Sequence, residues 1–181
     1  MSKHSFTADQ LNLLVDDSAA KQTNDWRPDV ALLTNWVAAA LNEVATDDWR
    51  AANVEVSLSY VAADSIKQLN ADYRQKDSVT NVLSFPAQMP LLASEEPDER
   101  STLVLGDIVL CPDVVQAEAQ AQSKLLEHHW AHLVVHSVLH LNGLDHLNES
   151  EAQTMESLEI QILSSLGIAN PYIAAERAEQ S

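Results

Sequence analysis

Six of the seven histidines lie between positions 128 and 146, and three of these have the spacing of a metal site. His136 and His140 are four residues apart, so on a helix their imidazoles lie on the same face. Gly143 follows, and because glycine adopts positive φ without a Cβ clash, the chain can turn back there and bring His146 to the same point. Three neutral imidazoles leave one position of a tetrahedral zinc ion open, which is typical of a catalytic site. We therefore predict one Zn²⁺ ion bound by His136, His140 and His146, with water or substrate as the fourth ligand.

A zinc ion in such a site lowers the pKa of its bound water to roughly 7, so it can supply a hydroxide nucleophile at neutral pH. The spacing is similar to the H-E-x-x-H-x-x-G-x-x-H motif of one zinc protease class, in which Glu is the general base. Here that position holds Ser137, which cannot act as this base. Peptide hydrolysis is therefore disfavoured, and a metallopeptidase or another zinc hydrolase is kept as an alternative.

The neighbouring polar residues receive other roles. His132 lies on the same helix face one turn earlier, and we expect it to pack or to hydrogen-bond rather than to bind the metal. His128 and His129 are expected to lie in solvent. Asp145 precedes His146, where orienting a ligand and capping the turn are equally good explanations.

The run from His136 to His146 resembles the H-G-x-L-H-L-x-G-y-D-H motif of the YbeY family, bacterial metal-dependent endoribonucleases that take part in rRNA maturation and ribosome quality control. Segments 73–77, 80–86, 105–108 and 170–173 are similar to the family as well, and the similarity covers roughly residues 54–173. Ser137 departs from the motif, which has Gly there. We expect no loss from this change, because a helix interior tolerates Ser better than Gly.

The resemblance implies that His136, His140 and His146 bind zinc, that His136 and Arg74 are catalytic, and that the substrate is RNA. It implies a single-strand-specific endoribonuclease that processes the 3′ end of 16S rRNA. The expected partners are the ribosome or ribosomal proteins, with neither DNA nor a membrane involved.

Arg74 also has a chemical argument of its own, since a planar guanidinium suits phosphate. Lys76 is a second candidate for this role. Without the family resemblance, an exposed charged pair near Asp77 is the better explanation for both. Three further residues could line the cleft with hydrogen-bond donors, although strand-edge pairing explains them equally well: Thr80, Asn81 and Ser84.

The chain carries 27 acidic and 10 basic side chains, for a net charge of −17. Basic surface supplies most of the affinity for phosphate backbones, so this charge argues against a nucleic-acid partner. Residues 60–92, however, have no net charge, and a zinc ion would add two positive charges at the cleft. RNA binding at one local site is therefore compatible with the composition. An acidic surface also suits basic proteins, so the alternative is a non-catalytic, metal-stabilised assembly factor that binds ribosomal proteins.

Composition limits the class of protein. The single cysteine, Cys111, excludes an internal disulfide framework, fits a reducing compartment and is most simply a small buried residue. The first residues lack the apolar core of a signal peptide, and no apolar run approaches the ~20 residues of a membrane helix. At 181 residues the chain suits one domain over residues 1–181. We therefore expect a cytoplasmic, single-domain protein.

Strands and helices are interleaved along the chain, which predicts an α+β fold. The family resemblance adds a small mixed β-sheet flanked by helices, with a metal-binding helix. Strands are predicted at 11–15, 53–61, 81–85 and 102–111, the last with Gly106 at a bulge or a close backbone approach. Helices are predicted at 29–45, at 64–73, from 112 to 142 with a break near 123–124, and from 150 to 167. Asp64 and Ser150 are the predicted N-caps, residues 87–100 a mobile loop, and the chain from Asn170 a frayed tail.

Overall fold

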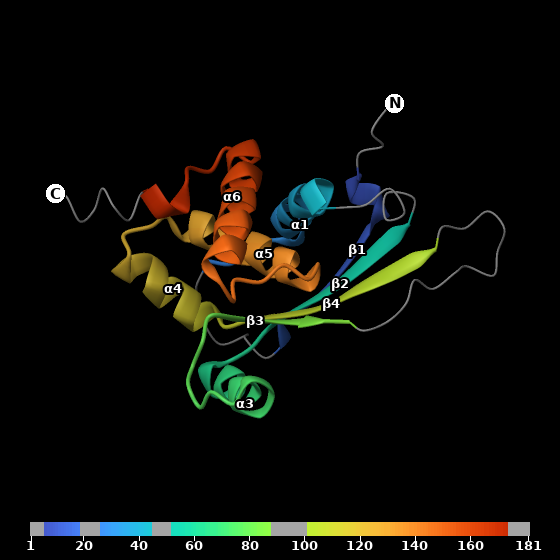
Figure 1. Cartoon of the computed structure of the whole chain (residues 1–181). Coiled ribbons are helices and arrows are strands. Elements are labelled where there is room, and N and C mark those ends of the chain that lie inside the picture. Colours follow the sequence, from blue (N-terminus) through green and yellow to red (C-terminus); the bar gives the residue numbers. More distant parts are fainter. Residues whose placement is uncertain (1–5, 19–25, 45–51, 88–100, 174–181) are drawn as a thin grey trace.

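The computed structural model describes residues 6–18, 26–44, 52–87 and 101–173 (Figure 1). Its strands are β1 (Leu11–Asp16), β2 (Asn53–Tyr60), β3 (Val82–Pro86) and β4 (Thr102–Leu110). Its helices are the 3₁₀ helix η1 (Ala8–Gln10), α1 (Val30–Val44), α3 (Ala63–Arg74), α4 (Pro112–Ala121), α5 (Leu126–Leu141) and α6 (Glu149–Ser165). The predicted α+β class is confirmed. The predicted loop at 87–100 lies outside the described residues from position 88 onward.

The four strands form one mixed sheet in the order β1-β2-β4-β3. β2 pairs in parallel with β1 and β4, whereas β3 pairs with β4 in the antiparallel direction and occupies an edge. Strand β2 alternates buried and partly buried residues, as its period-two pattern predicts, and its buried side chains are Val54, Val56, Leu58 and Tyr60. The sheet therefore offers one continuous apolar face to the helices.

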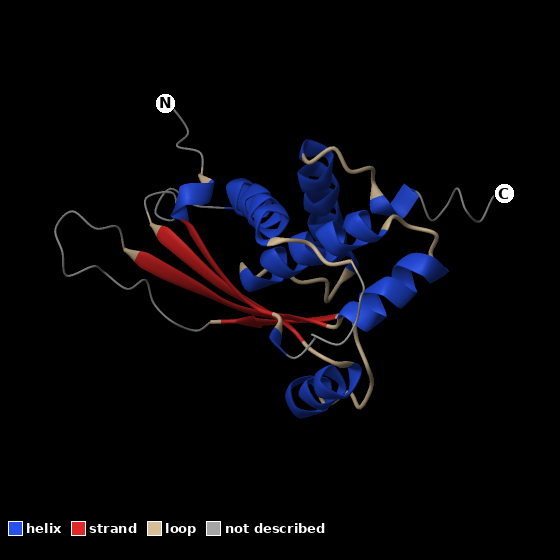
Figure 2. Cartoon of the chain, turned by 180° about the vertical axis from the view of Figure 1, so that it is seen from behind, coloured by secondary structure: helices blue, strands red, loops and turns tan. Residues whose placement is uncertain are grey.

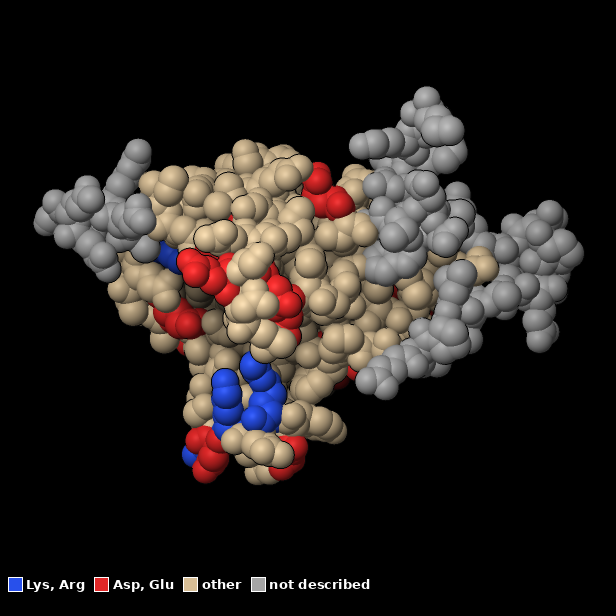
Figure 3. Space-filling view, in the orientation of Figure 1, with Lys and Arg blue, Asp and Glu red and all other residues tan. Residues whose placement is uncertain are grey.

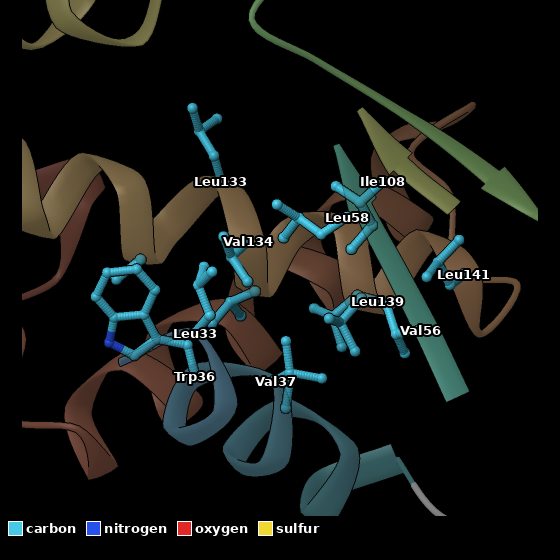
Figure 4. Close-up of a cluster of buried hydrophobic side chains, with 14 of the residues drawn as sticks. Leu33, Trp36, Val37, Val56, Leu58, Ile108, Leu133, Val134, Leu139 and Leu141 are labelled. Carbon is cyan, nitrogen blue, oxygen red and sulfur yellow. The ribbon is translucent and has the colours of Figure 1, made fainter. Parts of the chain in front are cut away.

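Helices α1 and α5 cover one face of the sheet, α6 packs on these two helices on the same side, and α3 lies against the opposite face (Figures 1 and 2). The main core joins α1 and α5 to the sheet, with Trp36 and Val134 between them (Figure 4). A second cluster joins α3 to the sheet through Ile66, Leu83 and Cys111, and Cys111 is fully buried as predicted. None of the helices in the described segments combines the length and apolar character that crossing a membrane requires.

A bulge separates the two halves of β4. Glu55 pairs with Val104, but the next residue of β2 pairs with Gly106, so one residue of β4 is left over. Gly106 has φ +141°, and a Cβ atom there would lie 2.2 Å from the carbonyl oxygen of Phe85. The predicted close backbone approach at this glycine is confirmed, and it sets the position of the end of β3.

Two predicted N-caps are wrong, and so is the predicted fraying of residues 170–173, while the rest of the predicted frayed tail lies outside the described residues. Helix α3 begins at Ala63, before Asp64, and its N-cap is Ala62. The N-cap of α6 is Asn148, whose side chain accepts a hydrogen bond from the backbone N–H of Glu151. At α6 the side chain of Asn148 takes the role expected of Ser150, whereas at α3 the N-cap Ala62 makes no side-chain hydrogen bond. Both boundaries differ from the prediction by one or two residues, as helix ends commonly do. The tail makes a helical turn over residues 171–173, because its tyrosine packs into the site described next.

Candidate metal centre

Helix α5 presents three of its histidines on a partly exposed side. From residue 129 to residue 141 every residue is buried except His132, His136 and His140. The rest of the helix packs against the sheet and its neighbouring helices, so the spacing of four residues becomes a partly exposed histidine stripe. Packing of the buried residues therefore fixes the rotation of α5 about its axis, and this directs the three imidazoles to the exposed side.

The turn after α5 returns the chain to this stripe. Gly143 has φ +88°, and its N–H donates to the carbonyl oxygen of His140 at 3.0 Å. The backbone reverses there and places His146 beside the helix. One ligand atom each from His136, His140 and His146 then lies within 4.8 Å of the others, and Nε2 of His136 is 3.0 Å from Nε2 of His140. The predicted convergence of the three histidines is confirmed.

The donor set of this cluster fits a zinc ion, which prefers tetrahedral coordination and imidazole nitrogens. His140 supports the fit: burial lowers its pKa, and so do the neighbouring imidazoles of His136 and His146. A lowered pKa keeps the imidazole neutral, which is the form that binds a metal. Asp145 accepts a hydrogen bond from the backbone N–H of His146 at 2.8 Å, so it braces the turn.

A buried carboxylate lies behind the histidines, and sequence reasoning missed it. Glu159 of α6 has no exposed surface, and its Oε1 accepts a hydrogen bond from Nδ1 of His136. Its Oε2 accepts from the hydroxyl of Tyr172 and lies 3.2 Å from Nε2 of His132. His132 thus hydrogen-bonds beside the metal cluster, as predicted for it. The available signal was Glu159 itself, a charged residue within the apolar stripe of Met155, Ile162 and Leu163.

Hydrogen bonds offset the effect of burial on the carboxyl group of Glu159. Burial raises the pKa of its carboxyl group, but the hydrogen bonds from His132, His136 and Tyr172 outweigh burial and lower the pKa to about 2. Burial, together with the hydrogen bond to this carboxylate, raises the pKa of Tyr172. The carboxylate of Glu159 therefore faces Nδ1 of the His136 ring from within the core.

The histidines form one wall of a pocket of about 570 Å³. Arg74, the last residue of α3, lines the same pocket, although α3 lies on the opposite face of the sheet. The edge strand β3 and the segment before it contribute the three polar residues named from the sequence: Thr80, Asn81 and Ser84. Lys76 is exposed and does not line this pocket. Figure 3 shows the Lys and Arg side chains of this region gathered over α3 and the segment after it.

Ser137 and His129, two further residues of α5, are both buried. Ser137 is fully buried and its hydroxyl donates to the carbonyl oxygen of Leu133, so the position after His136 offers no general base. The prediction that His129 lies in solvent is wrong, because only 5% of it is exposed. Its Nε2 lies 3.4 Å from Glu118, which also accepts a hydrogen bond from Asn81. This second cluster connects α4 and α5 to the pocket wall.

The sequence of this chain is similar to known proteins over most of its length. The family profile described as Endoribonuclease YbeY matches residues 18–167. Endoribonuclease YbeY of Colwellia psychrerythraea is 46% identical over 138 residues, covering 76% of this chain and 83% of the relative. That of Francisella tularensis subsp. novicida is 44% identical over 134 residues, 74% of this chain and 81% of the relative. A solution structure from Thermotoga maritima has a TM-score of 0.48 and 21% identity, covering 86% of this chain and 91% of that one. By its sequence matches, this chain belongs to the YbeY family of endoribonucleases.

Proposed function

We propose that residues 1–181 form one zinc-dependent, single-strand-specific endoribonuclease domain that acts in rRNA maturation, including the 3′ end of 16S rRNA, and in ribosome quality control. The proposed surroundings are the cytoplasm, with the ribosome or its proteins as partners and with neither DNA nor a membrane. The observation that carries the proposal is one pocket that holds His136, His140 and His146 together with Arg74.

The proposed roles follow from the chemistry of the side chains. When bound by the three histidines, a divalent metal supplies a Lewis acid that polarises a phosphoryl oxygen and activates water. Arg74 binds the scissile phosphate through its planar guanidinium and offsets the charge that develops there. Ser84 and Thr80 offer hydroxyl groups from the opposite wall, which can hydrogen-bond to the sugar or the phosphate.

Single-strand preference follows from the same surface. Among the described residues that line the pocket, Arg74 is the only Lys or Arg and Asp145 is the only acidic residue. Affinity for a duplex depends on several phosphate contacts along its length, and one arginine cannot provide them. In a single strand, by contrast, a base can unstack from its neighbours and enter a pocket. We expect labelled single-stranded rRNA fragments to be cut, and the same sequences annealed to a complement to be cut far more slowly. Equal cleavage of both forms would contradict the proposed preference.

Replacing Arg74 with glutamine should lower kcat/KM for RNA cleavage by about 10²-fold, since it removes one charged donor from the site of reaction. The matched control is Lys76→Gln, which removes the same charge two residues away and outside the pocket. The control should stay within about three-fold of the wild-type protein. Equal losses in both variants would show that Arg74 acts only through the general field of the surface. Steady-state cleavage of a fluorescent RNA at fixed salt measures both.

Metal removal should lower the thermal stability of the protein. A ligand that binds only the folded state adds about 2.7 kcal/mol when its concentration is 100 times its Kd. For a chain of this size, that free energy corresponds to roughly 5–10 °C in Tm. Calorimetry with excess zinc and with a strong chelator measures the difference. An unchanged Tm would contradict a metal site that is linked to folding.

A non-catalytic assembly factor is the second candidate, and the net charge of −17 favours it. An acidic surface attracts basic partners such as ribosomal proteins. The two candidates differ in what the metal cluster must do in cells. If a folded variant without His136 restores rRNA maturation in cells that lack the native protein, the binding role is sufficient and cleavage is not the essential activity.

A further inference from the structure

The hydrogen bonds of Glu159 connect it to side chains of a single pocket. In the described part of the chain its partners are His136, His132 and Tyr172, and each of them lines the pocket. Both carboxylate oxygens are occupied, Oε1 by His136 and Oε2 by the other two side chains. Glu159 therefore connects α6 and the turn at 171–173 to the ring of one predicted metal ligand.

Burial makes this arrangement costly to maintain. A charged side chain inside a core is expensive unless it is paired and hydrogen-bonded, and an apolar residue of similar volume is often equally stable there. Met155, Ile162 and Leu163 show that this side of α6 otherwise holds apolar side chains. Core packing alone does not call for a carboxylate at residue 159.

The chemistry of a carboxylate determines the tautomer of His136. A carboxylate accepts hydrogen bonds, and Oε1 of Glu159 is hydrogen-bonded to Nδ1 of His136, so this geometry places the proton of the ring on Nδ1. In the neutral ring the lone pair is then on Nε2. That nitrogen lies 3.0 Å from Nε2 of His140, at the point where the three histidines converge. The carboxylate thus selects the ring form that can bind a metal and holds the ring in the required direction.

We propose that Glu159 is the positioning residue of the metal centre, holding His136 in the Nδ1–H tautomer and directing Nε2 toward the metal. Tyr172 and His132 hold the second carboxylate oxygen and so keep Glu159 itself in place. This inference rests on the proposed metal site, but it does not depend on the identity of the RNA substrate.

The test compares Glu159→Gln with the wild-type protein. The change keeps the size of the side chain and removes its charge, so metal affinity should fall by about 10–100-fold. Competition between the purified protein and a chelating zinc indicator measures this affinity directly. In the metal-free protein, ¹⁵N chemical shifts of His136 should report the Nδ1–H form for the wild type and a tautomer mixture for the variant. A merely structural role would lower the unfolding midpoint but move neither the affinity of the folded protein nor the tautomer.

Tyr172→Phe is the second variant, in case Glu159→Gln does not fold. It removes one hydrogen bond to Glu159 from a half-buried side chain and should weaken zinc binding by about three- to ten-fold. Zinc affinity within about two-fold of the wild type in every variant that folds would overturn the proposal. Neither measurement uses RNA. A wild-type protein that shows the expected tautomer and zinc affinity but cuts no RNA would therefore refute the proposed function without contradicting the positioning role of Glu159.

Discussion

Replacing His140 with alanine should eliminate tight metal binding and reduce RNA cleavage by about 10³-fold or more. Its Nε2 is one of three converging imidazole nitrogens, and removing it leaves two protein ligands for a metal that needs three. The loss of a metal that stabilises transition-state charge amounts to several kcal/mol, and each 1.36 kcal/mol is roughly a factor of ten in rate. Elemental analysis of the purified variant and single-turnover cleavage of labelled RNA check the two effects.

The matched control is His128→Ala, three turns earlier on the same helix. His128 is half-buried and lines a separate small cavity, away from the three converging rings. This variant should keep one metal ion per chain and cleave RNA within about three-fold of the wild-type rate. Full activity in the His140 variant, with the metal absent, would show that cleavage does not use this centre.

The second large effect is expected at Gly106. An alanine Cβ would lie 2.2 Å from the carbonyl oxygen of Phe85 and 2.8 Å from the backbone nitrogen of Ala87, and both neighbours are backbone atoms that cannot turn aside. Its φ of +141° adds strain for any residue with a side chain. Together, overpacking and strain predict a loss of roughly 3–5 kcal/mol in the free energy of unfolding for Gly106→Ala. Urea unfolding followed by circular dichroism measures this loss.

Gly167→Ala separates the two causes. Gly167 also has positive φ, at +78°, but nothing lies within 4 Å of a Cβ atom there. This variant should lose only about 1–2 kcal/mol, because it carries strain without a clash. Similar losses at the two glycines would mean that the approach of β3 to the bulge is looser than the structure indicates.

Local patterns were sufficient to predict that the three histidines converge and to predict most of the helices and strands. The positions of His136 and His140 follow from helix geometry, and Gly143 permits the turn that returns His146. The alternation in β2 is likewise local, because side chains of a strand point to opposite faces in turn. Such features can be predicted from the spacing of residues that are close together in the sequence.

Features that depend on distant parts of the chain were not predictable in this way. Glu159 is 23 positions from His136, and only the packing of α6 on α5 brings them together. The edge position of β3 and the approach of Arg74 to the histidines likewise require the full strand order. Tyr172 was expected in a frayed tail, because a segment this short carries no periodic signal. Its contact with Glu159 is what orders this turn.

Titration of zinc into metal-stripped protein tests the central claim most directly, namely that the three-histidine centre cleaves RNA. The predicted result is no detectable cleavage of single-stranded RNA without metal. Cleavage should then rise in proportion to added zinc and reach a plateau at about one ion per chain, while His140→Ala stays inactive throughout. Equal cleavage by the stripped and the zinc-loaded protein would contradict the account.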